Sequence, residues 1–308
     1  MTKPKDSYLE VEVNSWRDLL DCGQAFQSYT FRGQNRVEWP LKTTLERMCD
    51  LYSTSFWEER ETPILEDFKR RAPYYLDHLP PDDQPFEWAS LLQHFGAPTR
   101  LLDVTDSFYV ALFFAIDAGP FESAVWAFDA LQLVVKPSPN KKLTIALDLH
   151  IHRDDPDARA FANEHYAKDG PLGVVQVRPF VLHPRLRMQQ GSFLFQIRAD
   201  SLFEHNLCKC FDIQYTAEGL LPNPLQVSLR ELPRRVCIRP NNRARLVRLR
   251  IKPTVHASAI AELRRMNISS ETLFPGLDGF ARSCQYPFQL ANKKPPVSAN
   301  MSSKKSPK

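Results

Sequence analysis

Nine apolar residues follow one another without interruption in FYVALFFAI, from Phe108 to Ile116. The run predicts a helix, and a helix that is apolar on all sides must be buried in a core. It is too short to cross a membrane. Residues 93–106, directly before it, are rich in polar and charged side chains and contain a glycine and a proline. The sequence therefore predicts a central buried helix that carries a polar turn into the interior.

Composition sets the scale of the molecule. The chain has 308 residues, of which 43% are hydrophobic and 25% charged, and its formal net charge is +4. These values are typical of a globular protein and exclude a disordered one. We expect one domain over residues 8–288, with a polar insertion around 130–175, between a flexible N-terminus (1–7) and a disordered basic tail (289–308).

The sequence shows neither a secretory signal nor an apolar run of about eighteen residues, so we expect a cytoplasmic protein without a membrane span.

The pattern of apolar residues predicts an α+β fold. In this prediction a helical N-terminal part packs on a mostly antiparallel sheet in the C-terminal half. Helices are predicted at residues 15–27, 43–48, 56–76, 87–94, 106–116 and 257–266, with Pro63 at a helix start. Strands are predicted at residues 28–33, 122–130, 143–152, 174–180, 191–199, 235–240 and 245–251.

The polar turn before the apolar run has two interpretations. Arg100 and Asp103 are three residues apart and would form a structural ion pair, because an unpaired buried guanidinium is costly. Alternatively the turn forms the floor of a cleft in which Gln93, His94, Thr99 and Arg100 face a ligand.

A second candidate site is the tripeptide Phe31-Arg32-Gly33. It ends a predicted strand, where an arginine presents five donors in a plane and a glycine leaves the backbone open to close approach. Phosphate or ribose would suit these groups. Strand-terminal Arg-Gly is also common in proteins that bind nothing, so the tripeptide alone decides little.

Two patterns bear on metal binding. Asp148, His150, His152 and Asp154 would share one face of a strand and would suit zinc, iron or manganese. The same alternation is typical of the wet face of an antiparallel sheet. Cys208 and Cys210 lack a second pair at ligand spacing. We therefore expect no metal.

A basic segment lies between Arg230 and Lys252, where nine basic residues accompany a single acid, Glu231. Arg245, Arg248 and Arg250 fall on or beside one predicted strand and would attract the phosphates of DNA or RNA. The alternative is a charged sheet edge that prevents pairing with other chains.

Four blocks of the sequence belong together: YTFRGQNRVEWPLKTTLER, LLQHFGAPTRLLDVTDSFYVALFFA, RLRMQQGSF and ISSETLFPGLDGFA. In this order they resemble the FRG domain, a family named after its Phe-Arg-Gly tripeptide, over roughly residues 8–285. Val104 stands where the family has a tryptophan. The family is in turn distantly similar to ADP-ribosyltransferase folds, in which an early arginine contacts the ribose of NAD and a later glutamate polarises it.

The resemblance implies NAD as ligand and a role for each matching residue. Arg32, Gln190 and Asp103 would be catalytic, while Phe31, Gly33, Gln93, His94, Thr99 and Arg100 would bind the nucleotide. The block RMQQGSF contains no glutamate, so Gln190 would position the substrate and a carboxylate such as Asp103 or Glu271 would act. Arg32 and the turn near residue 100 would then converge on one pocket.

The expected function is an NAD-dependent ADP-ribosyltransferase or another NAD-consuming enzyme, such as a bacterial toxin or phage-defence effector. A non-catalytic sensor of nucleotides or nucleic acid is the alternative, and a purely structural scaffold is the third.

Overall fold

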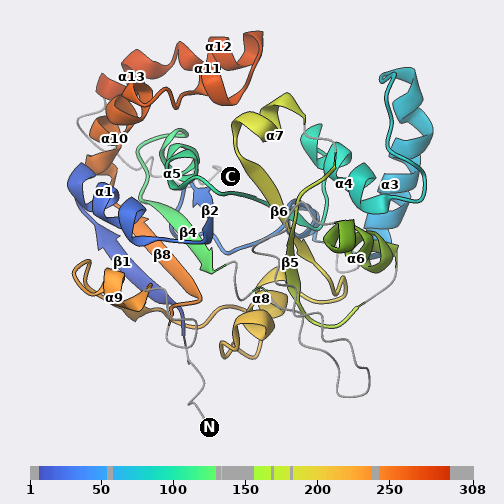
Figure 1. The fold of residues 1–308 in the computed structure, drawn as a ribbon, viewed down its shortest axis with the longest axis horizontal. Coiled ribbons are helices and arrows are strands. Elements are labelled where there is room, and N and C mark those ends of the chain that lie inside the picture. The colour runs from blue at the N-terminus through green and yellow to red at the C-terminus, as the bar shows by residue number, and fades with distance from the viewer. Residues whose placement is uncertain are drawn as a thin grey trace, which may run out of the picture.

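The computed structural model describes residues 7–53, 58–129, 133, 156–167, 170–180, 183–236 and 243–291. Its centre is one sheet with the strand order β5-β6-β3-β2-β4-β8-β1-β7. Figure 1 shows this sheet as two groups of strands, with helices packed around both. The strands are β1 (Leu9–Val13), β2 (Tyr29–Gln34), β3 (Leu101–Thr105), β4 (Ser123–Asp129), β5 (Val174–Val177), β6 (Gly191–Gln196), β7 (Leu225–Gln226) and β8 (Leu246–Ile251).

The sheet is mixed. Strand β1 runs parallel to both β7 and β8, whereas the other neighbouring strands are antiparallel. Strands β2 and β3 pair at a single position, Phe31 opposite Thr105. The sheet is therefore narrowly joined at this point and divides into the group β5-β6-β3 and the group β2-β4-β8-β1-β7.

The α+β class is confirmed, but the predicted division of the chain into a helical first part and a sheet-forming second half is wrong. Strands β1 to β4 all come from the first 130 residues, and β2, β3 and β4 lie in the middle of the sheet. The segment LLDVT of β3 was expected to be a turn. Its two leucines, its valine and its threonine are buried on the two faces of the sheet, and Asp103 alone in it is exposed.

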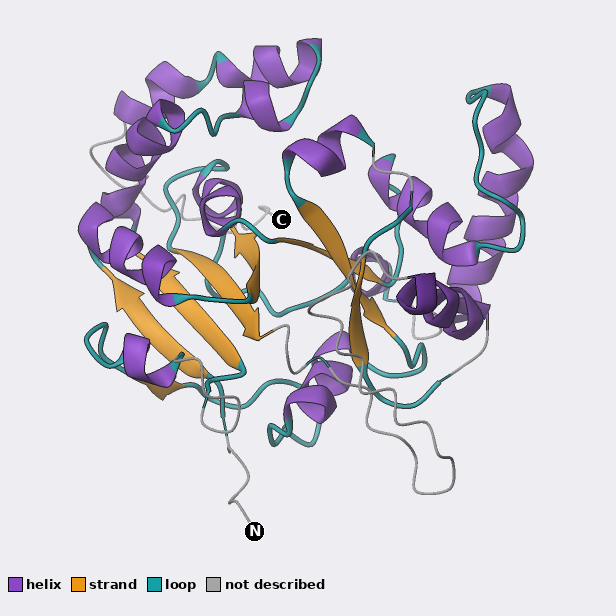
Figure 2. Ribbon diagram, viewed as in Figure 1, coloured by secondary structure: helices purple, strands orange, loops and turns teal. Residues whose placement is uncertain are grey.

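Helices surround the sheet on both faces (Figure 2). Those before β5 are α1 (Trp16–Ala25), α2 (Thr44–Leu51), α3 (Glu58–Arg71), the short 3-10 helix η1 (Ala72–Tyr74), α4 (Pro85–His94), α5 (Phe108–Ile116) and α6 (Pro156–Ala167). Those after it are α7 (Pro184–Met188), α8 (Phe203–Phe211), α9 (Leu232–Arg235), α10 (Pro253–Arg265), α11 (Ser270–Leu273), α12 (Leu277–Ser283) and α13 (Tyr286–Ala291).

Helix α5 is the apolar run, and it lies at the centre of the fold as predicted. Ser107 caps it by accepting a hydrogen bond from the amide of Val110. Seven of its nine residues are buried, and the helix packs on β2 so closely that a Cβ on Gly33 would lie 2.1 Å from the carbonyl oxygen of Ala111. Only glycine allows the strand and the helix backbone to approach in this way.

Three apolar clusters hold the layers together. One joins α1, α5 and α10 to the face of β2, β4, β8 and β1 that they cover. A second joins α3, α4 and α6 to β3, β5 and β6. The third lies on the opposite face, where residues of α8 pack against both strand groups. On one face of the sheet, α8 therefore joins the two strand groups in a single apolar cluster. On the other face, α5 and α4 belong to separate clusters.

Other local predictions differ in detail. Pro63 lies inside α3 and does not start it, since the helix begins five residues earlier, at Glu58. Residues 232–235 form α9, so the strand predicted at 235–240 begins in a helix, and residues 237–242 lie outside the described part. The described part of the chain also excludes the strand predicted at 143–152 and residues 292–308 of the predicted tail. The first residues of that tail, 289–291, belong to α13, which ends at Ala291.

In the described part of the chain, no helix combines the length and the apolar character that a membrane crossing requires.

Candidate functional site

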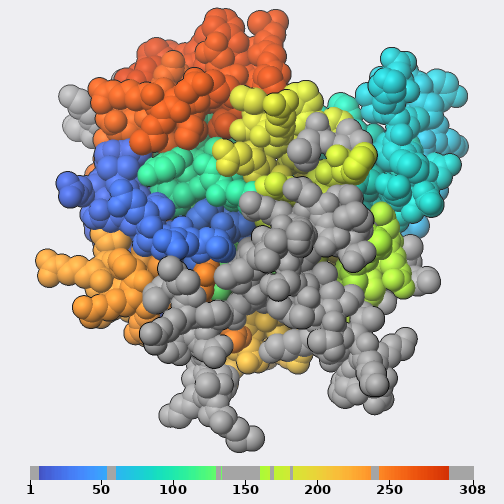
Figure 3. All heavy atoms as spheres, in the orientation of Figure 1, coloured from blue at the N-terminus to red at the C-terminus, as the bar shows by residue number. Residues whose placement is uncertain are grey.

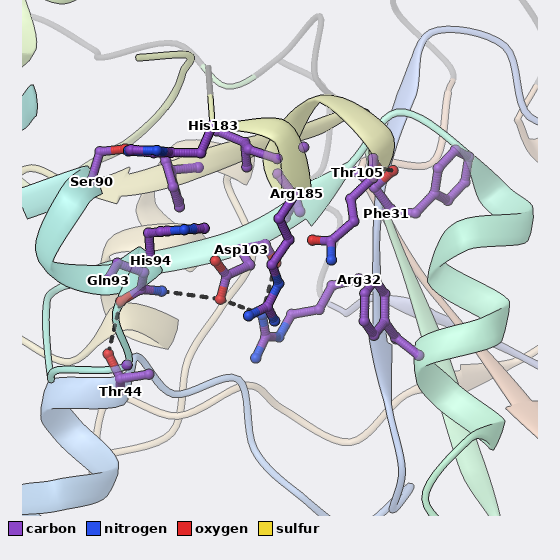
Figure 4. Close-up of a pocket in the computed structure, with 18 of the residues that line it drawn as sticks. Phe31, Arg32, Thr44, Ser90, Gln93, His94, Asp103, Thr105, His183 and Arg185 are labelled. Atoms are coloured by element: carbon purple, nitrogen blue, oxygen red, sulfur yellow. Dashed lines mark hydrogen bonds and ion pairs between the residues drawn. The ribbon is translucent and has the colours of Figure 1, made fainter. Parts of the chain in front are cut away.

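A pocket of about 300 Å³ lies where β2 and β3 separate. Its charged side chains and two of its polar ones are seen in Figure 4: Arg32 comes from β2, Asp103 from β3, Gln93 and His94 from α4, and Arg185 from α7. Phe31, Phe114 and Phe193 add apolar surface. Segments between Phe31 and Phe193 that lie far apart in the sequence therefore meet at one site, and the split in the sheet provides the space for it.

Arg32 crosses the gap between the two strand groups. Its Nη1 donates a hydrogen bond to the carbonyl oxygen of Asp103 at 2.7 Å, and the same nitrogen lies 3.9 Å from the Asp103 carboxylate. The side chain is 14% exposed, and its Nε has no hydrogen-bond partner among the described residues. Burial lowers the pKa of the Arg32 guanidinium to about 10; Asp103 opposes this lowering and Arg47 adds to it. An anion in the pocket would offset this desolvation.

Side chains alternate between the two faces of a strand, so the three residues of the Phe-Arg-Gly tripeptide face different surroundings. Residues 31 and 33 point to one face of β2, and residue 32 points to the other. Phe31 is 3% exposed and packs edge-on against Phe108 of α5, and Gly33 admits the α5 backbone. Both residues border the pocket. The sequence suggested that a glycine is needed at position 33 so that a ligand can approach the backbone, but the close contact with α5 already requires it.

Asp103 is held from α4. Gln93 Nε2 donates to Asp103 Oδ2 at 3.0 Å and to the carbonyl of Leu101 at 3.3 Å. Gln93 Oε1 accepts hydrogen bonds from the hydroxyls of Thr44 and Thr99, which fixes the orientation of the amide. Asp103 remains 58% exposed. Among the described residues that line the pocket, it is the sole carboxylate.

Arg100 lies outside the pocket. Its Nε is 2.8 Å from Glu61 Oε2, and its guanidinium lies over the ring of Tyr166. The expected ion pair between Arg100 and Asp103 is therefore wrong, because β3 begins at Leu101 and directs the two side chains to different surroundings. Thr99 is fully buried and does not line the pocket; it reaches the site through hydrogen bonds to two lining residues, Gln93 and Thr44.

The two glutamines of RMQQGSF are placed differently from the prediction. Strand β6 begins at Gly191, as predicted, and α7 ends at Met188, so both glutamines lie in the turn between the helix and the strand. Gln189 lines the pocket, while Gln190 is exposed, has a φ of +48° and is not among the lining residues. Glu271, the other carboxylate considered, is exposed on α11 and does not line the pocket.

Several site residues were missed from the sequence: Arg185, Gln189, His183, Thr44, Thr105 and Phe114. Arg185 and Gln189 are four residues apart and share a face of a helix. Had PRLRMQQ been predicted to be helical, Arg185 and Gln189 would have been expected to lie side by side. The loop that leads to His183 carries no comparable signal.

Two imidazoles form one wall of the pocket. His94 and His183 stack with their ring centroids 4.3 Å apart and their planes at 8°. Burial lowers the pKa of His94 to about 4, with His183 and Arg185 adding to the effect, and burial also lowers the pKa of His183. Both rings are therefore uncharged at neutral pH, and the positive charge of the pocket comes from its arginines.

The three arginines predicted to bind nucleic acid do not line the pocket. Arg248 pairs with Glu10 at 2.5 Å, Arg250 pairs with Glu122 at 2.6 Å, and Arg245 donates to the carbonyl of Phe211. Strand β8 lies between β4 and β1, so the alternative of a sheet edge is wrong.

The metal candidates remain without a described site. Residues 148–154 lie outside the described part of the chain. Cys208 and Cys210 are buried, and Cys210 accepts a hydrogen bond from the amide of Val174. Within the described residues, no group of three or more His, Cys, Asp or Glu side chains could hold a metal ion.

Comparison with curated proteins and comparison with solved structures returned no match. Comparison with family models returned the FRG domain, over residues 27–122. This range contains the Phe-Arg-Gly strand, α4, β3 and α5 and is shorter than the expected span of 8–285. The part of the chain that supplies Arg32, Gln93 and Asp103 to the pocket therefore lies within the match to the FRG domain.

Proposed function

We propose that the pocket binds an NAD-type nucleotide and that the protein transfers or hydrolyses its ADP-ribosyl group. The observation that carries this proposal is the largely buried guanidinium of Arg32, whose Nε lacks a partner among the described residues and which lies beside Asp103, the one carboxylate of the described lining. A guanidinium is the side chain best suited to phosphate, because it offers paired, charge-assisted hydrogen bonds. Arg32 would hold the phosphates or the adjoining ribose.

The size and lining of the pocket suit part of such a ligand. Its volume of about 300 Å³ lies at the lower end of the range for small-molecule sites. A dinucleotide would therefore extend beyond the pocket, with one nucleotide inside. The stacked imidazoles of His94 and His183, together with Phe114 and Phe193, offer the apolar and aromatic surface that a base and a ribose require.

Asp103 would supply the negative charge that the reaction needs. The bond between the ribose C1′ and the nicotinamide nitrogen breaks, its electron pair leaves with the neutral nicotinamide, and positive charge develops on the ribose. A carboxylate held in place beforehand stabilises this charge without reorganisation. Gln93 provides that restraint. An acceptor hydroxyl, amine or water then bonds to C1′ and releases its proton.

A second candidate function, a non-catalytic nucleotide sensor, is favoured by one observation. No glutamate is found among the described residues that line the pocket, and the nearest polar side chain from the RMQQGSF segment is Gln189, which supplies a dipole in place of a charge. A sensor would bind the same ligand and leave it intact.

If the protein is an enzyme, it would suit the role of a toxin or phage-defence effector.

Turnover of labelled NAD separates the two functions. The protein is incubated with labelled NAD and with DNA, RNA or protein acceptors, alongside Arg32→Ala, Asp103→Asn and the control Arg187→Gln, whose exposed side chain lies outside the pocket. Label transfer or nicotinamide release that is lost in the first two variants and kept in the control supports the enzyme. An increase in melting temperature without turnover supports the sensor. If millimolar NAD produces neither turnover nor an increase in melting temperature, both functions are refuted.

A further inference from the structure

Arg185 reaches the pocket from α7, far along the chain from the FRG match. Its side chain points into the cavity toward Asp103 and Arg32 (Figure 4). The guanidinium carbon lies 4.5 Å from the centre of the Phe274 ring. Phe274 follows α11 directly and is 6% exposed. Arg185 is therefore supported on the face of a buried aromatic ring, which favours a cation electrostatically.

The ring of Phe274 is itself fixed from several sides. It packs edge-on against Phe114 of α5, with the centroids 5.9 Å apart, and Arg282 of α12 lies over it at 4.8 Å. Arg282 also donates two hydrogen bonds to Asp117 at the end of α5. A Cβ on Gly279 would lie 1.8 Å from the carbonyl oxygen of Phe274, so α12 is folded tightly onto this residue.

The same C-terminal helices hold a second pocket residue. Gln189 Nε2 donates to the carbonyl oxygen of Leu273 at 3.0 Å, one residue before Phe274. Figure 3 shows the C-terminal helices, in orange to red, lying against the segment that contains α7, in yellow. Two side chains of the pocket thus depend on α11 and α12, which lie beyond the residues that match the FRG domain.

The charges at the pocket are unbalanced. Asp103 is the sole acid among the described lining residues, and its charge favours both the Arg32 and the Arg185 guanidinium; Asp278, outside the lining, also favours that of Arg185. Two guanidinium groups that share one lining carboxylate leave an excess of positive charge in the pocket, which attracts an anionic group such as phosphate.

We propose that Arg185 is a second anion-binding residue of the pocket and that Phe274 positions it, so that the C-terminal helices complete a site for a diphosphate group. This inference deepens the proposed function and rests on it for the nucleotide. Arg32 and Arg185 hold the two phosphates from opposite strand groups, and Phe274 keeps the Arg185 guanidinium at the cavity. A ligand with one phosphate binds more weakly than its diphosphate counterpart.

Binding of inorganic pyrophosphate tests the anion site without any turnover. Affinity is measured by calorimetry at fixed ionic strength for the wild type, Arg185→Gln and the matched control Arg187→Gln. Both arginines are exposed on the same helix, but Arg187 does not line the pocket. We expect Arg185→Gln to weaken binding roughly tenfold or more, as for a lost charge-assisted hydrogen bond, and Arg187→Gln to change it little. No pyrophosphate binding by the wild type, or equal losses in both variants, would overturn the proposal.

The positioning role of Phe274 needs its own comparison. Phe274→Leu removes the aromatic face, Phe274→Tyr keeps it, and Phe280→Leu changes an exposed ring of α12. We expect the first variant alone to weaken pyrophosphate binding, by roughly two- to tenfold, with melting temperatures recorded for all three. Unchanged binding in a folded Phe274→Leu variant would refute the role. If Phe274→Leu does not fold, weak binding by a folded Phe274→Tyr variant would refute it too.

The result is separable from the proposed function. Pyrophosphate binding that depends on Arg185, together with intact NAD after long incubation, would reject the enzymatic function and leave the diphosphate site standing. Turnover of NAD that is the same in the wild type and in Arg185→Gln would support the enzymatic function and reject the role of Arg185 in a diphosphate site.

Discussion

Arg32 bonds to the main chain of Asp103, with its Nη1 donating to the carbonyl oxygen at 2.7 Å across the gap between β2 and β3. Strand pairing stops at Phe31 and Thr105, and an extended register would place residue 33 opposite Asp103. A side chain thus replaces the backbone ladder where the sheet opens. This side-chain contact leaves room for a pocket while the two strand groups stay connected.

The first prediction concerns the stability of the protein without Arg32. The guanidinium is buried and makes one hydrogen bond to a carbonyl, and Asp103 is 58% exposed and held by Gln93. Arg32→Met therefore leaves no buried unpaired charge. We expect its free energy of unfolding to be unchanged or up to about 2 kcal/mol higher, since apolar replacement of a desolvated charge is often stabilising. Urea denaturation measures this, and a loss of more than about 2 kcal/mol would show that Arg32 is structural.

Arg100 gives the opposite expectation. Its partner Glu61 is 4% exposed, so Arg100→Met strands a buried carboxylate. We expect a loss of about 3–5 kcal/mol in the free energy of unfolding. The double variant Glu61→Gln with Arg100→Met should recover part of this loss, because the stranded charge is gone. If the single variant is as stable as the wild type, the buried pair does not form.

Helix α5 and the Phe-Arg-Gly strand were predictable from the sequence because their patterns are local. An apolar run must be buried, and a strand alternates its faces whatever its neighbours are. The α+β class follows from the same patterns. The partner of Arg100 was not predictable, because Glu61 is 39 residues away and only the packing of α3 brings it close. Arg185 and Gln189 were missed because five residues are too few to distinguish a helical turn from a strand.

The third prediction concerns Gly33. A Cβ at this position would lie 2.1 Å from the carbonyl oxygen of Ala111 and 2.6 Å from the amide nitrogen of Ala115. Both atoms are backbone, so α5 as a whole must shift. We expect Gly33→Ala to lower the free energy of unfolding by about 3 kcal/mol, at the upper end for overpacking.

The matched control for Gly33 is Gly96→Ala. No atom lies within 4 Å of the added Cβ there, but the φ of +89° adds strain of about 1 kcal/mol. Equal losses in the two variants would mean that the close approach of α5 to β2 is not what selects glycine at position 33.

The fourth prediction is a pH dependence of stability. Burial lowers the pKa of His256 to about 4, and its Nε2 lies 3.2 Å from the hydroxyl of Ser123. An unfolded histidine titrates at about 6.5, so between that pH and about 4 the unfolded chain binds more protons than the folded one. The free energy of unfolding therefore falls as the pH falls through this window.

Comparison with His256→Gln isolates this contribution from that of the carboxylates, which also titrate at low pH. We expect the variant to lose less stability than the wild type between pH 7 and about 4.5, as measured by urea denaturation at several pH values. Parallel curves for the two proteins would show that His256 is protonated as readily in the folded state as in the unfolded chain.

The fifth prediction separates a structural role of the β8 arginines from a role in nucleic-acid binding. Arg248 pairs with Glu10, which is 2% exposed, and its guanidinium lies 5.2 Å from the centre of the Trp126 ring. Strand β8 is internal, so removal of this arginine takes the closest cation from a buried carboxylate between strands and leaves it Gln226 and the more distant Arg250, at 4.0 Å. We expect Arg248→Gln to lower the free energy of unfolding by about 3 kcal/mol and to leave any salt-dependent binding of DNA or RNA unchanged. Weaker binding at unchanged stability would instead assign β8 to a nucleic-acid interface, because only a contact with phosphate would then account for the charge.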